Sequence, residues 1–328
     1  MQDRVSHAAI VRGDIGKFLL EIHRPKTRLC RMRMGFAVPV TGPWATRENL
    51  RVIATRAEEL GYDDVWTFQR LLYPVDHAMG PVYRSVLDPL VSLSYLAGLT
   101  ERIGLGVAVV NAYEPPVLLA KQLASLQVVS EGRVTAGIGL GWLPEEFEAM
   151  GLPFAARGRR GEEFLQLLRT CWTEDVVTHQ GEFYQVSASH LDPKPSPVPP
   201  VLLGGGAEVA LRRAGRIADG WVSASREDLT RIDEKIYIVK VAAEEAGRDP
   251  ETLRIVCRGV TKVRNSADGP PLTGSYDKIR DDLATLAEKG VTEVFHDLNF
   301  DPEIAVAAPE EAMSRALEAL EELAPGRT

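Results

Sequence analysis

Short apolar runs alternate with longer amphipathic segments along most of the chain, and this alternation predicts strands followed by helices. The first apolar run covers residues 34–39, and residues 47–60 have the spacing of an amphipathic helix that ends at Gly61. Residues 64–67 predict a second strand. Residues 103–110 are apolar on both faces, which is typical of a parallel strand buried inside a protein.

The same alternation continues to the end of the chain. Further strands are predicted at residues 134–138, 201–203, 220–222, 253–263 and 292–297, and further helices at 89–99, 117–129, 159–172, 208–218, 229–246, 275–289 and 309–323. Residues 176–186 predict a hairpin. Eight strands, each followed by a helix or by a loop and a helix, predict an α/β fold: a (β/α)8 TIM barrel with loop insertions at its C-terminal face.

The first 33 residues differ from the rest of the chain in charge. They contain eight Lys and Arg against three Asp and Glu, which leaves a net charge of −13 for the remaining residues. They lack the apolar stretch and the cleavage site of a secretory signal peptide. We expect residues 1–33 to be a basic N-terminal extension outside the fold, or the result of a start codon assigned too early, and residues 34–328 to form the barrel domain.

Composition excludes several classes of protein. The chain has 328 residues and a formal net charge of −8, and this acidic balance argues against binding to nucleic acid, which requires a basic surface. No apolar run approaches the roughly 20 residues of a membrane-spanning helix. The three cysteines and six histidines lack the spacing of a disulfide framework or a helical metal site, so we expect no metal and a cytoplasmic location.

Three consecutive glycines, Gly204, Gly205 and Gly206, follow an apolar strand and open a predicted helix. Residues without side chains let the backbone approach an anion closely, and the N–H groups of the first helical turn point toward it. We expect this turn to bind a phosphate or a carboxylate. A strand-to-helix turn without any ligand is the alternative.

A second glycine-rich segment follows the predicted strand 134–138. Its sequence suggests a dinucleotide-binding turn, but that motif needs a glycine where this chain has Trp142. We interpret Gly139 and Gly141 as clearance for a flat ring system, with Trp142 in the wall around it. Simple packing of a glycine-rich turn is the alternative.

Several other residues are candidates for binding or chemistry. Ala108 is small enough to let a planar ring rest at the barrel mouth, and Arg157 and Arg160 could bind an anionic cofactor, although basic clusters usually face solvent. The pair His296 and Asp297 could act as acid and base, with a hydrogen-bonded core histidine as the alternative.

The order and spacing of these motifs carry a resemblance that extends over nearly all residues after Met34. The motifs are residues 59–66, 102–106, 132–134, 137–142, 181–184, 199–206, 218–221 and 290–294. On these segments the sequence resembles the luciferase-like monooxygenase superfamily, and within it the branch that depends on the deazaflavin coenzyme F420. The resemblance implies that residues 34–328 form a luciferase-like barrel, which binds a flavin or deazaflavin at its open end.

The resemblance also implies roles for residues in this barrel. The glycine-rich turn at residues 204–206 would hold the cofactor phosphate, although many relatives have a hydroxyl residue where this chain has Ala207. In the deazaflavin branch a non-prolyl cis peptide backs the ring, and Ala108–Val109 is the matching position. The catalytic residues stay unknown, with candidates Gln69, Asn111 and His296.

Two departures from the family pattern bear on the class of substrate. Sugar-phosphate dehydrogenases of this branch have an Asp-His pair where this chain has Phe68 and Gln69, and a Glu where it has Trp142. The missing acid and base argue against a sugar-phosphate substrate. Phe68, Trp142 and Trp44 are expected to form an apolar pocket, in which Gln69 and Asn111 orient a small-molecule substrate.

Three functions stay open at this point. The first is an oxidoreductase that transfers a hydride between coenzyme F420 and an organic substrate. The second is an FMN-dependent monooxygenase that uses O2 and receives reduced flavin from a partner reductase. The third is a non-catalytic flavin-binding barrel. The resemblance further implies a homo-oligomer, because most members of the superfamily are dimers or larger.

The last candidate is the segment 145–148, which has three glutamates and Phe147. We interpret it as a solvent-facing turn rather than a catalytic pair of carboxylates.

Overall fold

The computed structural model describes residues 31–77 and 79–326. The proposed extension at residues 1–33 therefore lies almost entirely outside the described residues. Its last residue, Arg33, is the first residue of strand β1. The described residues from Met32 onward form one compact unit, which is the barrel described below.

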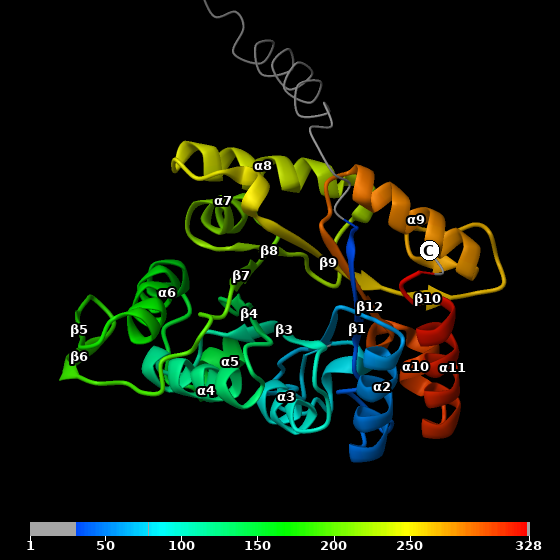
Figure 1. Cartoon of the computed structure of the whole chain (residues 1–328), viewed down its shortest axis with the longest axis horizontal. Helices are drawn as coiled ribbons and strands as arrows, with labels where there is room; N and C mark the ends of the chain where they lie inside the picture. The colour runs from blue at the N-terminus through cyan, green and yellow to red at the C-terminus, as the bar shows by residue number, and fades with distance from the viewer. Residues whose placement is uncertain (1–30, 78, 327–328) are drawn as a thin grey trace, which may run out of the picture. The chain divides into compact units, whose positions relative to one another are not determined.

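Eight parallel strands close into a barrel (Figure 1). Their order around the barrel is β1-β12-β9-β8-β7-β4-β3-β2. Each barrel strand therefore pairs with the barrel strands that precede and follow it in the sequence, and β12 closes the barrel against β1. The strands are β1 (Arg33–Ala37), β2 (Asp64–Thr67), β3 (Gly104–Asn111), β4 (Val134–Gly139), β7 (Val201–Gly204), β8 (Gly220–Val222), β9 (Arg254–Val260) and β12 (Glu293–Asp297). The predicted (β/α)8 barrel is confirmed.

Helices follow the barrel strands and pack around them (Figure 1). They are α2 (Arg47–Glu59), α3 (Pro89–Ala97), α4 (Pro116–Val129), α5 (Pro144–Ala149), α6 (Arg157–Thr173), α7 (Glu208–Ile217), α8 (Ile232–Glu245), α9 (Tyr276–Glu288), α10 (Pro302–Val306) and α11 (Pro309–Glu322). Side-chain caps fix where several begin. The Thr46 hydroxyl accepts from the Asn49 N–H at the start of α2, and the Asp88 carboxylate accepts from the Val91 N–H at the start of α3.

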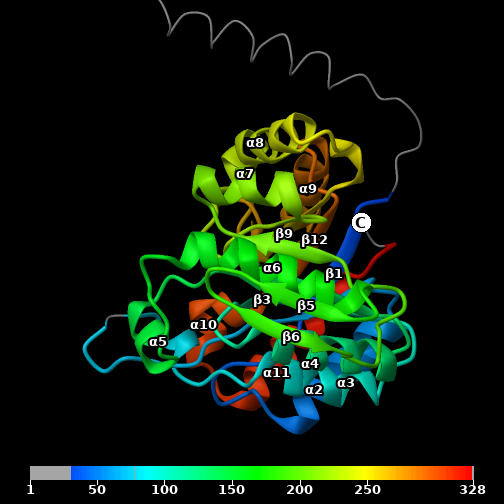
Figure 2. The ribbon, with the colours of Figure 1, turned by 90° about the vertical axis from the view of Figure 1, so that its left-hand side faces the viewer.

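Small insertions interrupt the alternation. Strands β5 (Val177–Gln180) and β6 (Gln185–Ser189) form the predicted hairpin, which Figure 2 shows beside α6. Strands β10 (Lys262–Val263) and β11 (Thr273–Gly274) form a second small sheet. Four 3-10 turns complete the elements: η1 (Pro81–Tyr83), η2 (Leu229–Arg231), η3 (Pro250–Thr252) and η4 (Leu298–Phe300).

Two predicted elements are each divided in the structure. The helix expected at residues 229–246 begins as the 3-10 turn η2, where the Asp228 carboxylate accepts from the Thr230 N–H, and continues as α8. The strand expected at residues 253–263 leaves the barrel after Val260. Its last two residues, β10, then pair with β11 instead.

The core has two parts. A large cluster fills the space between the strands and the surrounding helices. A smaller cluster, which includes Trp66 and Phe295, fills the interior of the barrel. These two rings stack at 4.9 Å between centroids with an interplanar angle of 15°. Side chains therefore fill the interior of the barrel, which is a packed core rather than a channel.

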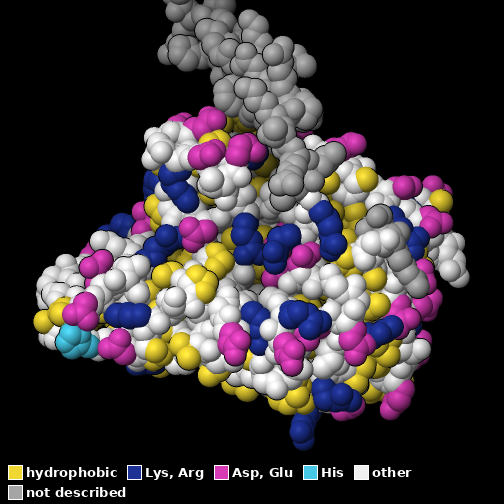
Figure 3. Space-filling model, viewed as in Figure 1, with side chains coloured by type: hydrophobic (Ala, Val, Ile, Leu, Met, Phe, Trp, Pro, Cys, Tyr) yellow, Lys and Arg dark blue, Asp and Glu magenta, His cyan; other side chains and the backbone are white. Residues whose placement is uncertain are grey.

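The surface matches the acidic, mixed composition. On the face shown in Figure 3, outside the grey atoms, acidic and basic side chains are interspersed over the surface. That face therefore offers no continuous basic surface for a phosphate backbone. Among the described residues, no helix has the length and hydrophobicity needed to cross a membrane.

Candidate active site

A pocket of about 590 Å³ opens at the carboxyl ends of the barrel strands. The carboxyl-terminal parts of β3 and β9, the loop after β2, and the ends of β4, β7 and β8 with the loops after them contribute to it, as expected for the active-site face of a barrel. The lining includes most of the predicted site residues: Gln69, Ala108, Val109, Asn111, Gly139, Gly141, Trp142, Arg157, Gly204, Gly205 and Gly206. Most of the predicted site residues therefore lie in the wall of one pocket, although they make up less than half of its lining.

The floor of the pocket includes the small residues Ala108 and Gly139, where β3 and β4 end. The Ala108–Val109 peptide is cis, at the position that the resemblance implied. A Cβ atom on Gly139 would lie 2.5 Å from both the Val109 Cγ2 and the Asn111 Oδ1. Any side chain at position 139 would therefore force this floor apart, which explains the glycine.

The glycine-rich turn after β7 forms one end of the pocket. Gly205 has a φ of 125°, which side-chain-bearing residues rarely adopt, and its carbonyl accepts from the Trp221 indole N–H at 2.8 Å. A Cβ atom on Gly206 would lie 3.0 Å from the Lys235 Nζ, so this ammonium lies directly beside the turn. This ammonium pairs with the buried Glu227 carboxylate, whose Oε2 would lie 3.5 Å from the same Cβ atom. The feature of the turn that suits a phosphate is therefore its bare backbone at the start of α7.

Two arginines lie at the same end. Arg157 is half-buried, and its guanidinium lies 4.0 Å from the centroid of the Phe154 ring. Arg213 is buried, and its Nε donates to the Glu162 carboxylate at 2.9 Å. Both line the pocket. Sequence reasoning identified Arg157 but missed Arg213 and Lys235, because their approach to the turn depends on how α7 and α8 pack.

A third arginine lies at the centre of the pocket wall. Arg258 projects from β9; its Nε donates to Asp297 at 2.7 Å and its Nη1 donates to the Ala108 carbonyl at 3.0 Å. Its guanidinium also lies 4.7 Å from the Phe68 ring centroid and 4.4 Å from that of Phe300. Arg258 therefore connects the floor of the pocket at Ala108 with Asp297 on β12, across the barrel. A charged residue inside an otherwise apolar strand was the signal that could have identified it.

Gln69 and Asn111 lie together in the wall, as predicted. The Gln69 side-chain oxygen accepts from the Asn111 backbone N–H at 2.8 Å, and the Gln69 backbone N–H donates to the Val109 carbonyl at 3.2 Å. Both side chains are more than nine-tenths buried. They join the loop after β2 to the end of β3 and present amide groups at the pocket.

Two predicted candidates lie elsewhere. Arg160 is buried and donates from Nη1 to the Ala112 carbonyl at 2.7 Å and to the Tyr184 hydroxyl at 2.9 Å, and it does not line the pocket. His296 is fully buried in β12, with its Nδ1 2.9 Å from the Thr261 hydroxyl, and it does not line the pocket either. Burial lowers the pKa of His296 to about 4.

The interpretation of residues 145–148 as a solvent-facing turn is wrong for Glu146. This carboxylate is fully buried, and it pairs with Arg70 at 2.9 Å. The expected apolar pocket is also wrong in part. Trp44 is buried in the core away from the lining, whereas Arg70 and Arg258 both line the pocket. The sequence carries no local signal for these pairs, because each joins residues far apart in the chain.

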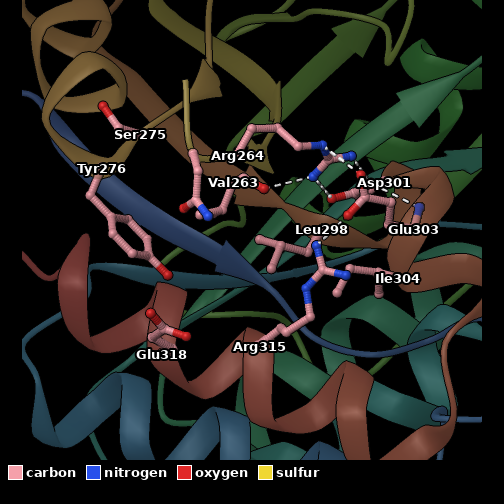
Figure 4. A pocket seen from close by; sticks show the side chains of 11 residues that line it. Val263, Arg264, Ser275, Tyr276, Leu298, Asp301, Glu303, Ile304, Arg315 and Glu318 are labelled. Atoms are coloured by element: carbon pink, nitrogen blue, oxygen red, sulfur yellow. Dashed lines mark hydrogen bonds and ion pairs between the residues drawn. The ribbon is translucent and has the colours of Figure 1, made fainter. Parts of the chain in front are cut away.

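A second cavity of about 360 Å³ lies between β10, α10 and α11. Figure 4 shows that its charged side chains face one another. Arg264 pairs with Asp301 at 2.7 Å and with Glu303 at 2.8 Å, and Arg315 pairs with Glu303 at 2.8 Å. The first pocket is the better candidate for an active site, because it lies at the carboxyl ends of the barrel strands and includes the glycine-rich turn.

Similar curated proteins include an uncharacterized protein, a dehydrogenase and a monooxygenase. An uncharacterized protein of Mycobacterium tuberculosis is 32% identical over 74% of this chain and 82% of its own length. The F420-dependent glucose-6-phosphate dehydrogenase of Amycolatopsis mediterranei is 31% identical over 60% of each chain. Pyrimidine monooxygenase RutA of Allorhizobium ampelinum is 30% identical over 66% of this chain and 61% of its own.

Solved structures share the fold. An F420-dependent secondary alcohol dehydrogenase superposes with a TM-score of 0.73 at 15% identity, over 89% of this chain and 99% of its own. Monooxygenase RslO1 of Streptomyces bottropensis superposes with a TM-score of 0.71 at 20% identity, over 90% of this chain and all of its own. The luciferase-like monooxygenase family model matches residues 32–269. The chain therefore belongs to the luciferase-like monooxygenase family and is an enzyme of the oxidoreductase class.

Proposed function

We propose that this enzyme transfers a hydride between coenzyme F420 and an organic substrate in the pocket at the carboxyl ends of its strands. The observation that carries the proposal is the division of the pocket into two parts. One end combines the bare turn at residues 204–206 with Arg157, Arg213 and Lys235, and the other has a floor with the small residues Ala108 and Gly139. An anionic side arm and a flat ring fit this pair of features.

The density of positive charge favours F420 over FMN. The side arm of F420 carries carboxylates beyond its phosphate, so it needs more cationic partners than the side arm of FMN. Four arginines line the pocket, and no acidic side chain is among the described residues that line it. Arg70, Arg213 and Arg258 each pair with a carboxylate outside the lining, whereas Arg157 has no such pair among the described residues. The kinship to an F420-dependent glucose-6-phosphate dehydrogenase supports the same choice.

The lining residues bind and orient rather than exchange protons. The bound deazaflavin would supply or accept the hydride, and it reacts poorly with O2 in its reduced form. No His, Cys, Asp or Glu is among the described residues that line the pocket. Gln69 and Asn111 would position the substrate through their amides, while Trp142 and Phe68 would exclude water from the reacting atoms.

The alternative is an FMN-dependent monooxygenase that uses O2. The kinship to pyrimidine monooxygenase RutA and the fold shared with monooxygenase RslO1 favour it. Only this alternative requires a partner flavin reductase. For either cofactor we propose a homo-oligomer, and sedimentation velocity on the purified protein tests that part.

Reaction of reduced cofactor with a panel of ketones, aldehydes and activated alkenes separates the two functions. With reduced F420, we expect cofactor oxidation that depends on a substrate and proceeds at the same rate with and without O2. Product formation that requires both reduced FMN and O2, with no reaction of reduced F420, would establish the monooxygenase instead.

A further inference from the structure

Arg70 lies at the end of the pocket opposite the glycine-rich turn, on the loop after β2. Its side chain is only 5% exposed, yet it lines the pocket. The guanidinium carbon lies 4.7 Å from the centroid of the Trp142 ring and 5.1 Å from that of Tyr83. Its Nε is buried without any hydrogen-bond partner. The guanidinium thus lies against two adjacent aromatic rings at the pocket wall, with hydrogen-bonding capacity that no described protein group satisfies.

Glu146 fixes the position of this guanidinium from behind. Its Oε1 accepts from the backbone N–H groups of Leu71 at 2.8 Å and Leu72 at 3.3 Å, and its Oε2 accepts from the Tyr113 hydroxyl at 2.7 Å. Three neutral donors thus already stabilise the carboxylate, besides Arg70. The Arg70 charge is held in place without all of its donors being consumed, which is the arrangement of a preorganised binding group.

The surroundings of Arg70 define the rest of the ligand. Trp142 is 48% exposed and Phe68 lies in the same wall, so the space beside the guanidinium is bounded by aromatic faces. The Glu146 carboxylate lies outside the lining. A ligand that fits has a negative group for Arg70 and an apolar body for the rings.

We propose that Arg70 binds the carboxylate of the organic substrate, so that the enzyme acts on apolar carboxylic acids. This inference rests on the proposed function, because it assumes that the substrate occupies the end of the pocket beside Trp142. Arg70 is then a specificity-determining residue, and its planar guanidinium suits a carboxylate better than an ammonium does.

Matched pairs of acids and amides test the inference without knowledge of the natural substrate. The probes are benzoate and benzamide, cinnamate and cinnamamide, and hexanoate and hexanamide. Their dissociation constants are measured by quenching of tryptophan fluorescence on the whole protein, with inorganic phosphate present to occupy the glycine-rich turn. The variants are R70K, R70Q, the double variant R70Q/E146Q, R157Q at the other end of the pocket and, as an exposed control, R159Q.

For at least one pair we expect the acid to bind wild-type protein and R159Q about 10- to 100-fold more tightly than the amide, the effect of one charge-assisted hydrogen bond. R70Q should abolish this preference and R70K should keep part of it. The double variant removes both charges of the buried pair, so it gives the same answer if R70Q fails to fold.

Three outcomes overturn the inference. The first is equal binding, or no binding, of acid and amide in all three pairs. The second is an undiminished preference in R70Q or the double variant. The third is a preference that is lost in R157Q but kept in R70Q, which would place the carboxylate at the other end. Titration of the same proteins with F420 separates the two proposals, since failure of wild-type protein to bind F420 contradicts the proposed function alone.

Discussion

At the scale of single residues, Arg157 and Arg159 are close neighbours on α6 with different surroundings. Arg157 lines the pocket and has no ion pair with a carboxylate among the described residues, whereas exposed Arg159 pairs with Glu182. We expect Arg157→Leu to weaken cofactor binding by about tenfold, since a charge-assisted hydrogen bond to phosphate is lost. Arg159→Leu should leave the dissociation constant unchanged. Equal effects of the two substitutions in a fluorescence titration would remove Arg157 from the site.

His296 gives the protein a predictable response to acid. Burial lowers its pKa to about 4, so below its ordinary pKa the unfolded chain binds a proton that the folded chain does not. Its stabilising contribution is therefore complete near neutral pH and is lost on acidification. From about pH 7 to about pH 5, wild-type protein should lose about 2 kcal/mol of unfolding free energy relative to His296→Gln. Parallel pH profiles of the two proteins in urea denaturation would contradict this assignment.

At the scale of elements, Glu146 joins helix α5 to the loop after β2. It accepts from the backbone of Leu71 and Leu72 and pairs with Arg70, all from that loop. Glu146→Ala leaves the buried guanidinium uncompensated, so we expect the free energy of unfolding to fall by about 3–5 kcal/mol. The control is Glu148→Ala at an exposed position of the same helix, which should change it by less than about 0.5 kcal/mol. Similar urea midpoints for both variants would show that Glu146 does not hold the loop.

Helices α7 and α8 approach each other closely at Gly215. A Cβ atom there would lie 2.0 Å from the Val239 carbonyl oxygen and 3.0 Å from the Ala242 Cβ. Gly215→Ala should therefore lower the free energy of unfolding by about 1–3 kcal/mol through overpacking, although alanine favours helix by about 1 kcal/mol. Gly158→Ala in α6 is the control, because its methyl group would meet only the tip of the Arg213 side chain at 3.3 Å. A stabilised Gly215→Ala variant in urea denaturation would exclude this close contact.

The elements themselves could be predicted from the sequence because their signals are local. Strand β3 is a continuous apolar run, and Pro89 and Pro116 mark the starts of α3 and α4. The cis peptide at Ala108–Val109 could be expected only from the resemblance, since nothing in the residue types there requires it. Local sequence patterns are therefore sufficient to predict the barrel and the glycine-lined parts of the pocket.

The charged parts of the pocket could not be predicted in the same way. Arg258 and Asp297 lie 39 residues apart in the sequence, and they meet only because β9 and β12 are neighbours in the closed barrel. Arg70 and Glu146 meet because the loop after β2 folds against α5. Pairing of this kind depends on tertiary packing, so a charge run such as residues 145–148 looks solvent-facing in the sequence alone.

At the scale of the whole molecule, the two ends of the barrel use charge differently. At the amino-terminal end, Glu293 is fully buried and pairs with Arg254 at 2.6 Å and with Arg33 at 3.5 Å. Burial and then the charge of Asp64 raise the pKa of Glu293. This network lies where the strands begin, and its ion pairs stabilise the closed barrel. At the carboxyl end four arginines line an open pocket, and three of them also pair with carboxylates.

The central claim is that this pocket binds coenzyme F420. Equilibrium titration of the purified protein with F420 and with FMN, followed by quenching of tryptophan fluorescence, tests it most directly, because Trp142 lies in the wall of the pocket. We predict saturable, tight binding of F420 and at least about tenfold weaker binding of FMN, the difference of one charge-assisted contact. Tight binding of FMN together with no binding of F420 would contradict the account.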